Sequence, residues 1–175
     1  MAVEKSQEDC SKEAYATVGE LILITNTLDF QLAAVVIEVL SLGRAAMLVP
    51  VVMTLEPSRK IEILKTHTTH ISQLNWKKGL TAYIEKIERV LKYRNIACHT
   101  QPNLKGSEWT LVPFAAAKML KNIDMKRKTL NAVSMTDLRK AISTAEEALD
   151  AGMNLIKNFQ RVNAELAKRA VEKRQ

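Results

Sequence analysis

The 175-residue sequence contains few of the residues that interrupt helices or build tight turns. Five glycines and four prolines are too few for a β-sandwich or a barrel, which need many tight turns. The two cysteines, Cys10 and Cys98, are isolated from each other and do not support a disulfide framework or a zinc-ribbon motif. We therefore expect an all-α chain in a reducing, cytoplasmic compartment.

Long hydrophobic runs and targeting signals are also lacking. The longest uncharged run in the apolar region, residues 45–55, is about half of the length that spans a bilayer. The N-terminal residues do not show the basic and then apolar order of a signal peptide. With no internal repeat and no linker, the sequence predicts one soluble domain over residues 1–175. Its ends are expected to fray at about residues 1–10 and 168–175, and no membrane partner is expected.

Charge is abundant and unevenly distributed. The formal net charge is +7 and the isoelectric point is about 9.5. Residues 1–56 hold three basic and eight acidic side chains, residues 57–128 hold fifteen and five, and residues 129–175 hold eight and six. The positive excess therefore lies in the middle segment. It is compatible with a polyanionic partner but does not identify that partner.

Apolar residues recur at helical spacing in four main segments. The first runs from Ala14 to Leu42 as one long helix or two nearly collinear ones, with Ser11 as N-cap and Gly43 as the stop. Three polar residues fall on its expected solvated face: Asp29, Gln31 and Glu38. Residues 45–55, which contain Pro50, are expected to dock on the core as a loop or a broken helical turn.

The second and third helices are amphipathic. Pro57 opens the second helix, which has Arg59, Lys60 and Lys65 at its margins. Its inner positions are Ile61, Leu64, His67 or Thr68, and Ile71. The third helix follows the Gly79 region, and its inner positions are Leu80, Ile84, Ile87, Leu91, Arg94 and Cys98.

Pro102 ends the third helix, and Asn103 to Gly106 is turn chemistry. Glu108 to Phe114 is expected to form a short extended segment or one arm of a hairpin. Ser134 and Asp137 resemble a capping box that starts the last long helix. The inner positions of that helix are Leu138, Ile142, Ala145, Leu149, Met153, Ile156 and Phe159. The fold expected is an up-and-down bundle of four to five helices, with a possible short hairpin after the third main helix.

Arg94 is the most informative residue of the third helix. It occupies an inner position that Leu or Ile fills at earlier turns, and an arginine there must find an anion or another acceptor. Asn95 and His99 are four residues apart and share a face, whereas Arg94 and His99 diverge by about 140° on an unbroken helix. They can serve one site if the last turn unwinds before Pro102, or if two copies of the helix meet across a dimer interface.

The segment Arg94-Asn95-Ile96-Ala97-Cys98-His99 resembles the signature of the HEPN family (higher eukaryotes and prokaryotes nucleotide-binding domains). That signature is an Arg, often followed by Asn or another polar residue, with a His four to six residues after the Arg. The surroundings are also similar, because the chain is small and all-α and places the motif at the end of a helix. Active members commonly have a small residue directly after the His, where this chain has Thr100.

The resemblance implies a homodimeric, metal-independent endoribonuclease, found in the family as a toxin or in antiviral defence. Arg94 would hold the scissile phosphate, Asn95 would bind the phosphate or orient the imidazole, and His99 would move the proton. No cofactor is implied, and any antitoxin must be a separate polypeptide. Other members have lost catalysis, so an inactive dimerisation or nucleotide-binding module of a larger system is the alternative.

Several residues have plainer interpretations. Arg94 can be a structural arginine paired with a carboxylate, for which the candidates are Glu20, Glu38 and Glu62. A basic cluster can guide RNA or can be a solvated face: Lys118, Lys121, Lys126, Arg127 and Lys128. His67 and His70 make at most half of a metal site, so no metal is expected. The position of Cys98 on the inner stripe predicts a small core residue.

Overall fold

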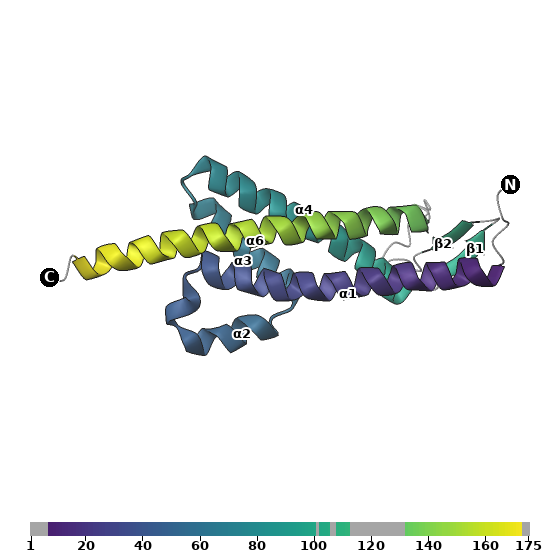
Figure 1. Cartoon of the computed structure of the whole chain (residues 1–175), viewed down its shortest axis with the longest axis horizontal. Helices are drawn as coiled ribbons and strands as arrows, with labels where there is room; N and C mark the ends of the chain where they lie inside the picture. The colour runs from purple at the N-terminus through teal and green to yellow at the C-terminus, as the bar shows by residue number, and fades with distance from the viewer. Residues whose placement is uncertain (1–6, 101, 106–107, 113–131, 173–175) are drawn as a thin grey trace, which may run out of the picture. The chain divides into compact units, whose positions relative to one another are not determined.

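The computed structural model describes residues 7–100, 102–105, 108–112 and 132–172. The α-helices are α1 (Gln7–Val39), α2 (Val49–Thr54), α3 (Pro57–His70), α4 (Leu74–His99) and α6 (Met135–Glu172). Two 3₁₀ turns, η1 (Leu42–Arg44) and η2 (Ala46–Leu48), precede α2. Three short strands are β1 (Pro102–Lys105), β2 (Glu108–Leu111) and β3 (Val133–Ser134) (Figure 1). The predicted helical fold with a hairpin after the third main helix is confirmed.

The chain forms two compact units, each built from two separate segments. Unit 1 contains the described residues of 1–25 and 89–143, and unit 2 those of 26–88 and 144–175. The long helices α1, α4 and α6 each contain a boundary between the units. The single domain over residues 1–175 stays a prediction.

Unit 1 combines helix ends with an antiparallel sheet in the order β1-β2-β3. Pro102 is opposite Leu111, and Leu111 is opposite Val133. Residues 102–105 form an edge strand instead of the expected turn, because a proline, which has no N–H to donate, fits an edge. The core of unit 1 is aliphatic: Ala14, Leu21, Val90, Ala97, Leu111, Val133, Leu138 and Ala141.

The predicted capping box at the start of α6 is confirmed. The Asp137 amide donates to Ser134 Oγ at 3.1 Å, and the Ser134 amide donates to Asp137 Oδ2 at 3.2 Å. The Ser134 hydroxyl also donates to Asp137 Oδ2 at 2.9 Å. These bonds satisfy backbone donors that have no partner within the helix. The helix then continues to Glu172, into the segment that was expected to fray.

Unit 2 has a larger core with polar groups inside it. Its buried apolar residues include Leu28, Leu32, Val35, Val36, Leu64, Leu80, Tyr83, Ile84, Ile87, Ala145 and Ala148. Gln31 Nε2 donates to the Leu149 carbonyl at 2.6 Å, and the Tyr83 hydroxyl donates to Gln31 Oε1 at 3.3 Å. Burial raises the pKa of the Tyr83 hydroxyl.

The expected solvated face of α1 is wrong, because its polar residues bind neighbouring elements. Lys60 Nζ is 2.7 Å from Asp29 Oδ1, and the Lys60 side chain is 1% exposed, not at the margin of α3. Asn163 Nδ2 donates to Glu38 Oε2 at 3.3 Å. Partners far along the chain therefore bury Lys60 and leave Asp29 and Glu38 only partly exposed, since a buried polar group needs a hydrogen bond.

Several predicted helix boundaries are wrong. Helix α1 begins before Ser11 and ends at Val39, and Ser41, not Gly43, takes the left-handed conformation with φ 55°. Helix α4 begins at Leu74 and contains Gly79. On α6, Met153 is 50% exposed instead of inward. Local signals place the helices but not their ends, since termination depends on the packing of the following residues.

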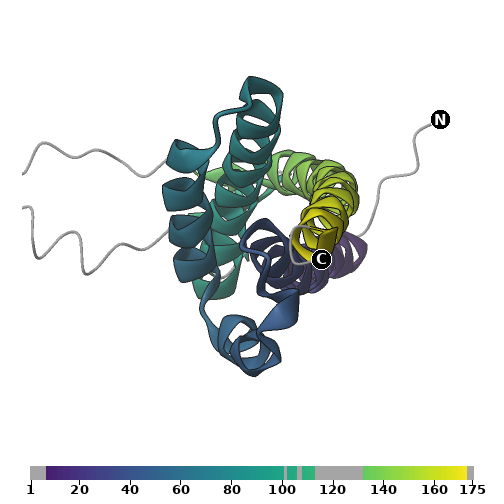
Figure 2. The same cartoon turned by 90° about the vertical axis from the view of Figure 1, so that its left-hand side faces the viewer.

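Residues 45–55 form a broken helical segment, as expected, but most of their side chains stay exposed instead of docking on the core. In Figure 2 this segment, with α2, lies at the edge of unit 2. Val52 is buried, while the other large apolar side chains of η2 and α2 face solvent: Met47, Leu48, Val51 and Met53. Pro50 lies in the first turn of α2, where a proline favours the start of a helix. The helix is only six residues long, and its apolar side chains other than Val52 are not buried by neighbouring elements.

One described helix is long and apolar enough to cross a membrane by length and composition alone. It is the Ser11–Val39 part of α1, with a mean hydropathy of 1.6 and 39% of the window buried. Glu20 and Asp29 interrupt its uncharged runs, which is why a count of uncharged residues misses it. The soluble, cytoplasmic location stays a prediction.

Candidate functional site

The three motif residues lie in the last turns of α4, within unit 1. Helix α4 stays helical through His99, so the last turn does not unwind before that residue. Arg94 and His99 therefore diverge by about 140° around one helix. A site that uses both side chains on one substrate then requires a second copy of the chain.

Arg94 and Asn95 contact each other. Arg94 Nη1 donates to Asn95 Oδ1 at 3.2 Å, and the Arg94 side chain is half-buried. Among the residues that the structure describes, no carboxylate lies within ion-pair distance of Arg94. The guanidinium therefore keeps donors that can bind a phosphate.

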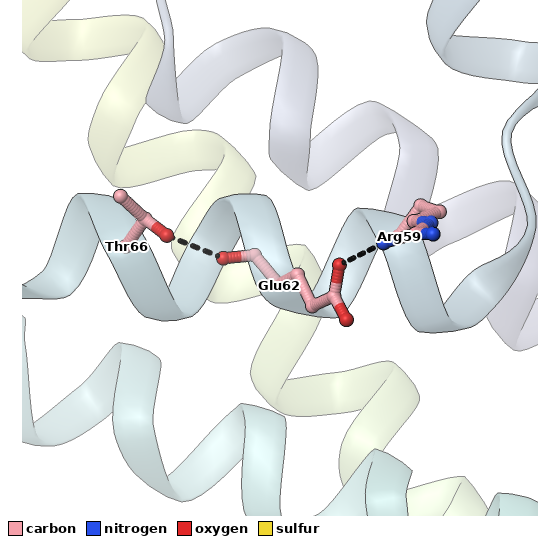
Figure 3. A network of polar contacts seen from close by, with 3 residues as sticks. All are labelled: Arg59, Glu62 and Thr66. Carbon is pink, nitrogen blue, oxygen red and sulfur yellow. Dashed lines mark hydrogen bonds and ion pairs between the residues drawn. The ribbon is translucent and has the colours of Figure 1, made fainter.

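Two of the carboxylates considered as structural partners of Arg94 have other partners. Arg59 Nη1 is 2.7 Å from Glu62 Oε2, and the Thr66 hydroxyl donates to the Glu62 carbonyl at 3.0 Å (Figure 3). The Glu62 carboxylate raises the pKa of the Arg59 guanidinium through this hydrogen bond and its charge. Glu38 Oε1 accepts a hydrogen bond from Gln160 at 3.1 Å. These contacts favour an arginine that is free for a ligand.

Asn95 and His99 are both exposed. Cys98 is exposed as well, so its predicted place in the core is wrong. Ala97, one residue earlier, is buried instead. The inner stripe was extrapolated from the first turns of α4, which belong to unit 2, whereas residues 89–99 pack within unit 1. A change of packing partners along a helix changes the face that is buried.

Sequence reasoning missed two exposed cations that share the Asn95 and His99 face. Arg89 and Lys92 precede Asn95 by six and three residues, and both are exposed. Positions 89, 92, 95 and 99 fall within an arc of about 120° on an α-helix. The spacing of these four residues in the sequence carries the signal, because it places them on the face of the helix opposite the inner positions.

The remaining candidates add no described residue to this site. The cluster Lys118, Lys121, Lys126, Arg127 and Lys128 lies outside the described residues. His67 is half-buried, and burial, followed by the charge of His70, lowers the pKa of His67. Within the described ranges no group of three or more His, Cys, Asp or Glu side chains could hold a metal ion.

A hollow of about 570 Å³ lies along one face of α6, and none of the motif residues lines it. Its lining is Asn154, Lys157, Asn158, Gln160, Arg161 and Ala164. All six belong to one exposed helix, so the hollow is a shallow surface feature. Comparisons with models of protein families, with curated proteins and with solved structures find no match to this chain.

Proposed function

We propose that the protein is a metal-independent endoribonuclease of the HEPN type that acts as a cytoplasmic homodimer, as a toxin or in antiviral defence. One observation carries the proposal: Arg94 has no carboxylate partner in the described part of the chain and lies against Asn95, five residues before an exposed His99. This residue set suits cleavage of RNA by its own 2′-OH.

The chemistry needs a fixed cation and a group that moves a proton. Arg94 binds the scissile phosphate, because a guanidinium keeps its charge and contacts two oxygens at once. Asn95 holds the phosphate or orients the imidazole. His99 transfers the proton, because an imidazole titrates near neutral pH. His99 takes the proton from the 2′-OH and returns it to the departing 5′-oxygen, so each composite site needs one His99.

The proposal is tested with a labelled RNA in the presence of a metal chelator. We expect the wild type to cleave, and Arg94→Ala and His99→Ala to lose at least about a hundredfold in rate, the usual contribution of a positioned acid or base. Arg161→Ala and His70→Ala are matched controls, because both residues are exposed and lie outside the motif. Cleavage that persists in both motif variants, or its absence in the wild type, would overturn the proposal.

A mixture of the two inactive variants tests the composite site. If Arg94 of one copy acts with His99 of the other, a mixed dimer has one complete site. About half of randomly formed dimers are mixed, so we expect roughly a quarter of the wild-type rate. No recovery after subunit exchange would contradict a site shared between copies.

The exposed apolar side chains of η2 and α2 favour the alternative, an inactive interaction module of a larger system. In that case His99→Ala leaves function unchanged, whereas substitutions at Met47 and Val51 abolish it. The two functions therefore predict opposite outcomes for the same His99 variant.

A further inference from the structure

The outer face of the last turns of α4 carries cations without carboxylate partners. These cations are Arg89 and Lys92, which are exposed and have no ion pair within the described residues, and His99 is exposed on the same face. The nearest acidic residue on this side, Glu88, is held by Lys65, with Nζ to Oε1 at 2.6 Å. Glu85 lies one turn before Arg89 and is exposed. The net charge of this face of α4, from Arg89 to the end of the helix, is therefore positive.

These residues form a single row along the helix. From residue 89 to residue 99 the rise is about 15 Å. Asn95 lies within the row, so it offers a hydrogen-bonding side chain between Lys92 and His99. A single row of cations fits the phosphates of one strand, whereas double-stranded RNA is contacted across its grooves on two strands.

We propose that Arg89 and Lys92 bind the phosphate backbone of single-stranded RNA and lead it along α4 to His99. This inference rests on the proposed function and adds two binding residues to it. Arg94 faces about 140° away from His99 and close to opposite the middle of the row. The strand therefore lies on the α4 of the protomer that supplies His99, and the other protomer supplies Arg94.

The proposed role of Arg89 and Lys92 is tested by measuring binding of a fluorescent single-stranded RNA that carries 2′-O-methyl groups. The methylated 2′-oxygen cannot attack the phosphate, so the RNA is bound but not cleaved. We expect Arg89→Glu/Lys92→Glu to bind at least tenfold more weakly than the wild type. Lys157→Glu/Arg161→Glu, with the same charge change on exposed residues of α6, should bind within about threefold of the wild type. For the neutral variant Arg89→Gln/Lys92→Gln, the slope of log affinity against log salt should fall by about 1.4, or 0.7 for each lost phosphate contact.

Equal weakening by the α6 control would overturn the inference, as would unchanged binding by Arg89→Gln/Lys92→Gln. Tighter binding of a duplex than of the single strand would also overturn it. Its failure is distinguishable from failure of the proposed function. His99→Ala should keep RNA binding while losing cleavage, and a wild type that binds without cleaving would refute catalysis and leave the row standing.

Discussion

Gly152 is a position in α6 where one methyl group has no room. A Cβ there would lie 2.5 Å from the side-chain amide carbon of Gln31 and 2.9 Å from a ring carbon of Tyr83. We expect Gly152→Ala to lower the free energy of unfolding by about 1–3 kcal/mol, the usual cost of overpacking. Urea denaturation measures the change.

Gly19 in α1 is the matched control, because an added Cβ meets nothing within 4 Å. Gly19→Ala should stabilise by about 0.5–1 kcal/mol through helix propensity. In the Gln31→Ala background, Gly152→Ala should cost clearly less than it does alone, because the obstructing side chain is gone. Equal costs in both backgrounds would show that Gln31 is not the obstacle.

The same residues show what the sequence could not predict. Gln31 was expected in solvent, but its amide lies between the Leu149 carbonyl and the Tyr83 hydroxyl. Lys60 was expected at a margin, but it pairs with Asp29 inside unit 2. In both cases the partner is at least 31 residues away, and helical spacing carries no information about partners on other elements.

The capping box allows a test at the scale of one element. We expect Ser134→Ala and Asp137→Ala each to cost about 1 kcal/mol of unfolding free energy, since each removes a cap of α6. The two bind each other, so the double variant should cost less than the sum. Thermal unfolding followed by circular dichroism checks this.

Thr136, an exposed residue between the two caps, gives the control. Thr136→Ala should change stability by less than about 0.5 kcal/mol. A loss as large as that of Ser134→Ala would show that the first turn of α6 is sensitive to any substitution.

Elements with local signals were predictable, and elements with nonlocal partners were not. Adjacent residues predict where two helices begin, at Pro57 and at the capping box. They also predict strand β2. Strand β1 was missed because its conformation depends on pairing with β2. At the candidate site, the motif itself was found in the sequence. The exposure of Cys98 and the row formed by Arg89 and Lys92 depend on which face of α4 is buried, and the packing of unit 1 decides that.

At the scale of the whole molecule, the proposed site requires two chains. One chain has a mass of 19.6 kDa, so sedimentation equilibrium should give about 39 kDa for a closed dimer. Sedimentation should be measured at the protein concentration that is used in the cleavage assay. Full cleavage by a species of single-chain mass would contradict the dimeric site.

The order of synthesis has a consequence for unit 1. Its first 25 residues leave the ribosome long before the second segment, residues 89–143, which completes the unit. At about 5–20 residues per second, synthesis of residues 26–88, which separate the two segments, takes roughly 3–13 s. During this time Ala14 and Leu21, buried in the finished protein, have none of their unit 1 partners from the second segment. The nascent chain therefore presents an apolar helix to chaperones, or to a membrane surface, before unit 1 can close over it.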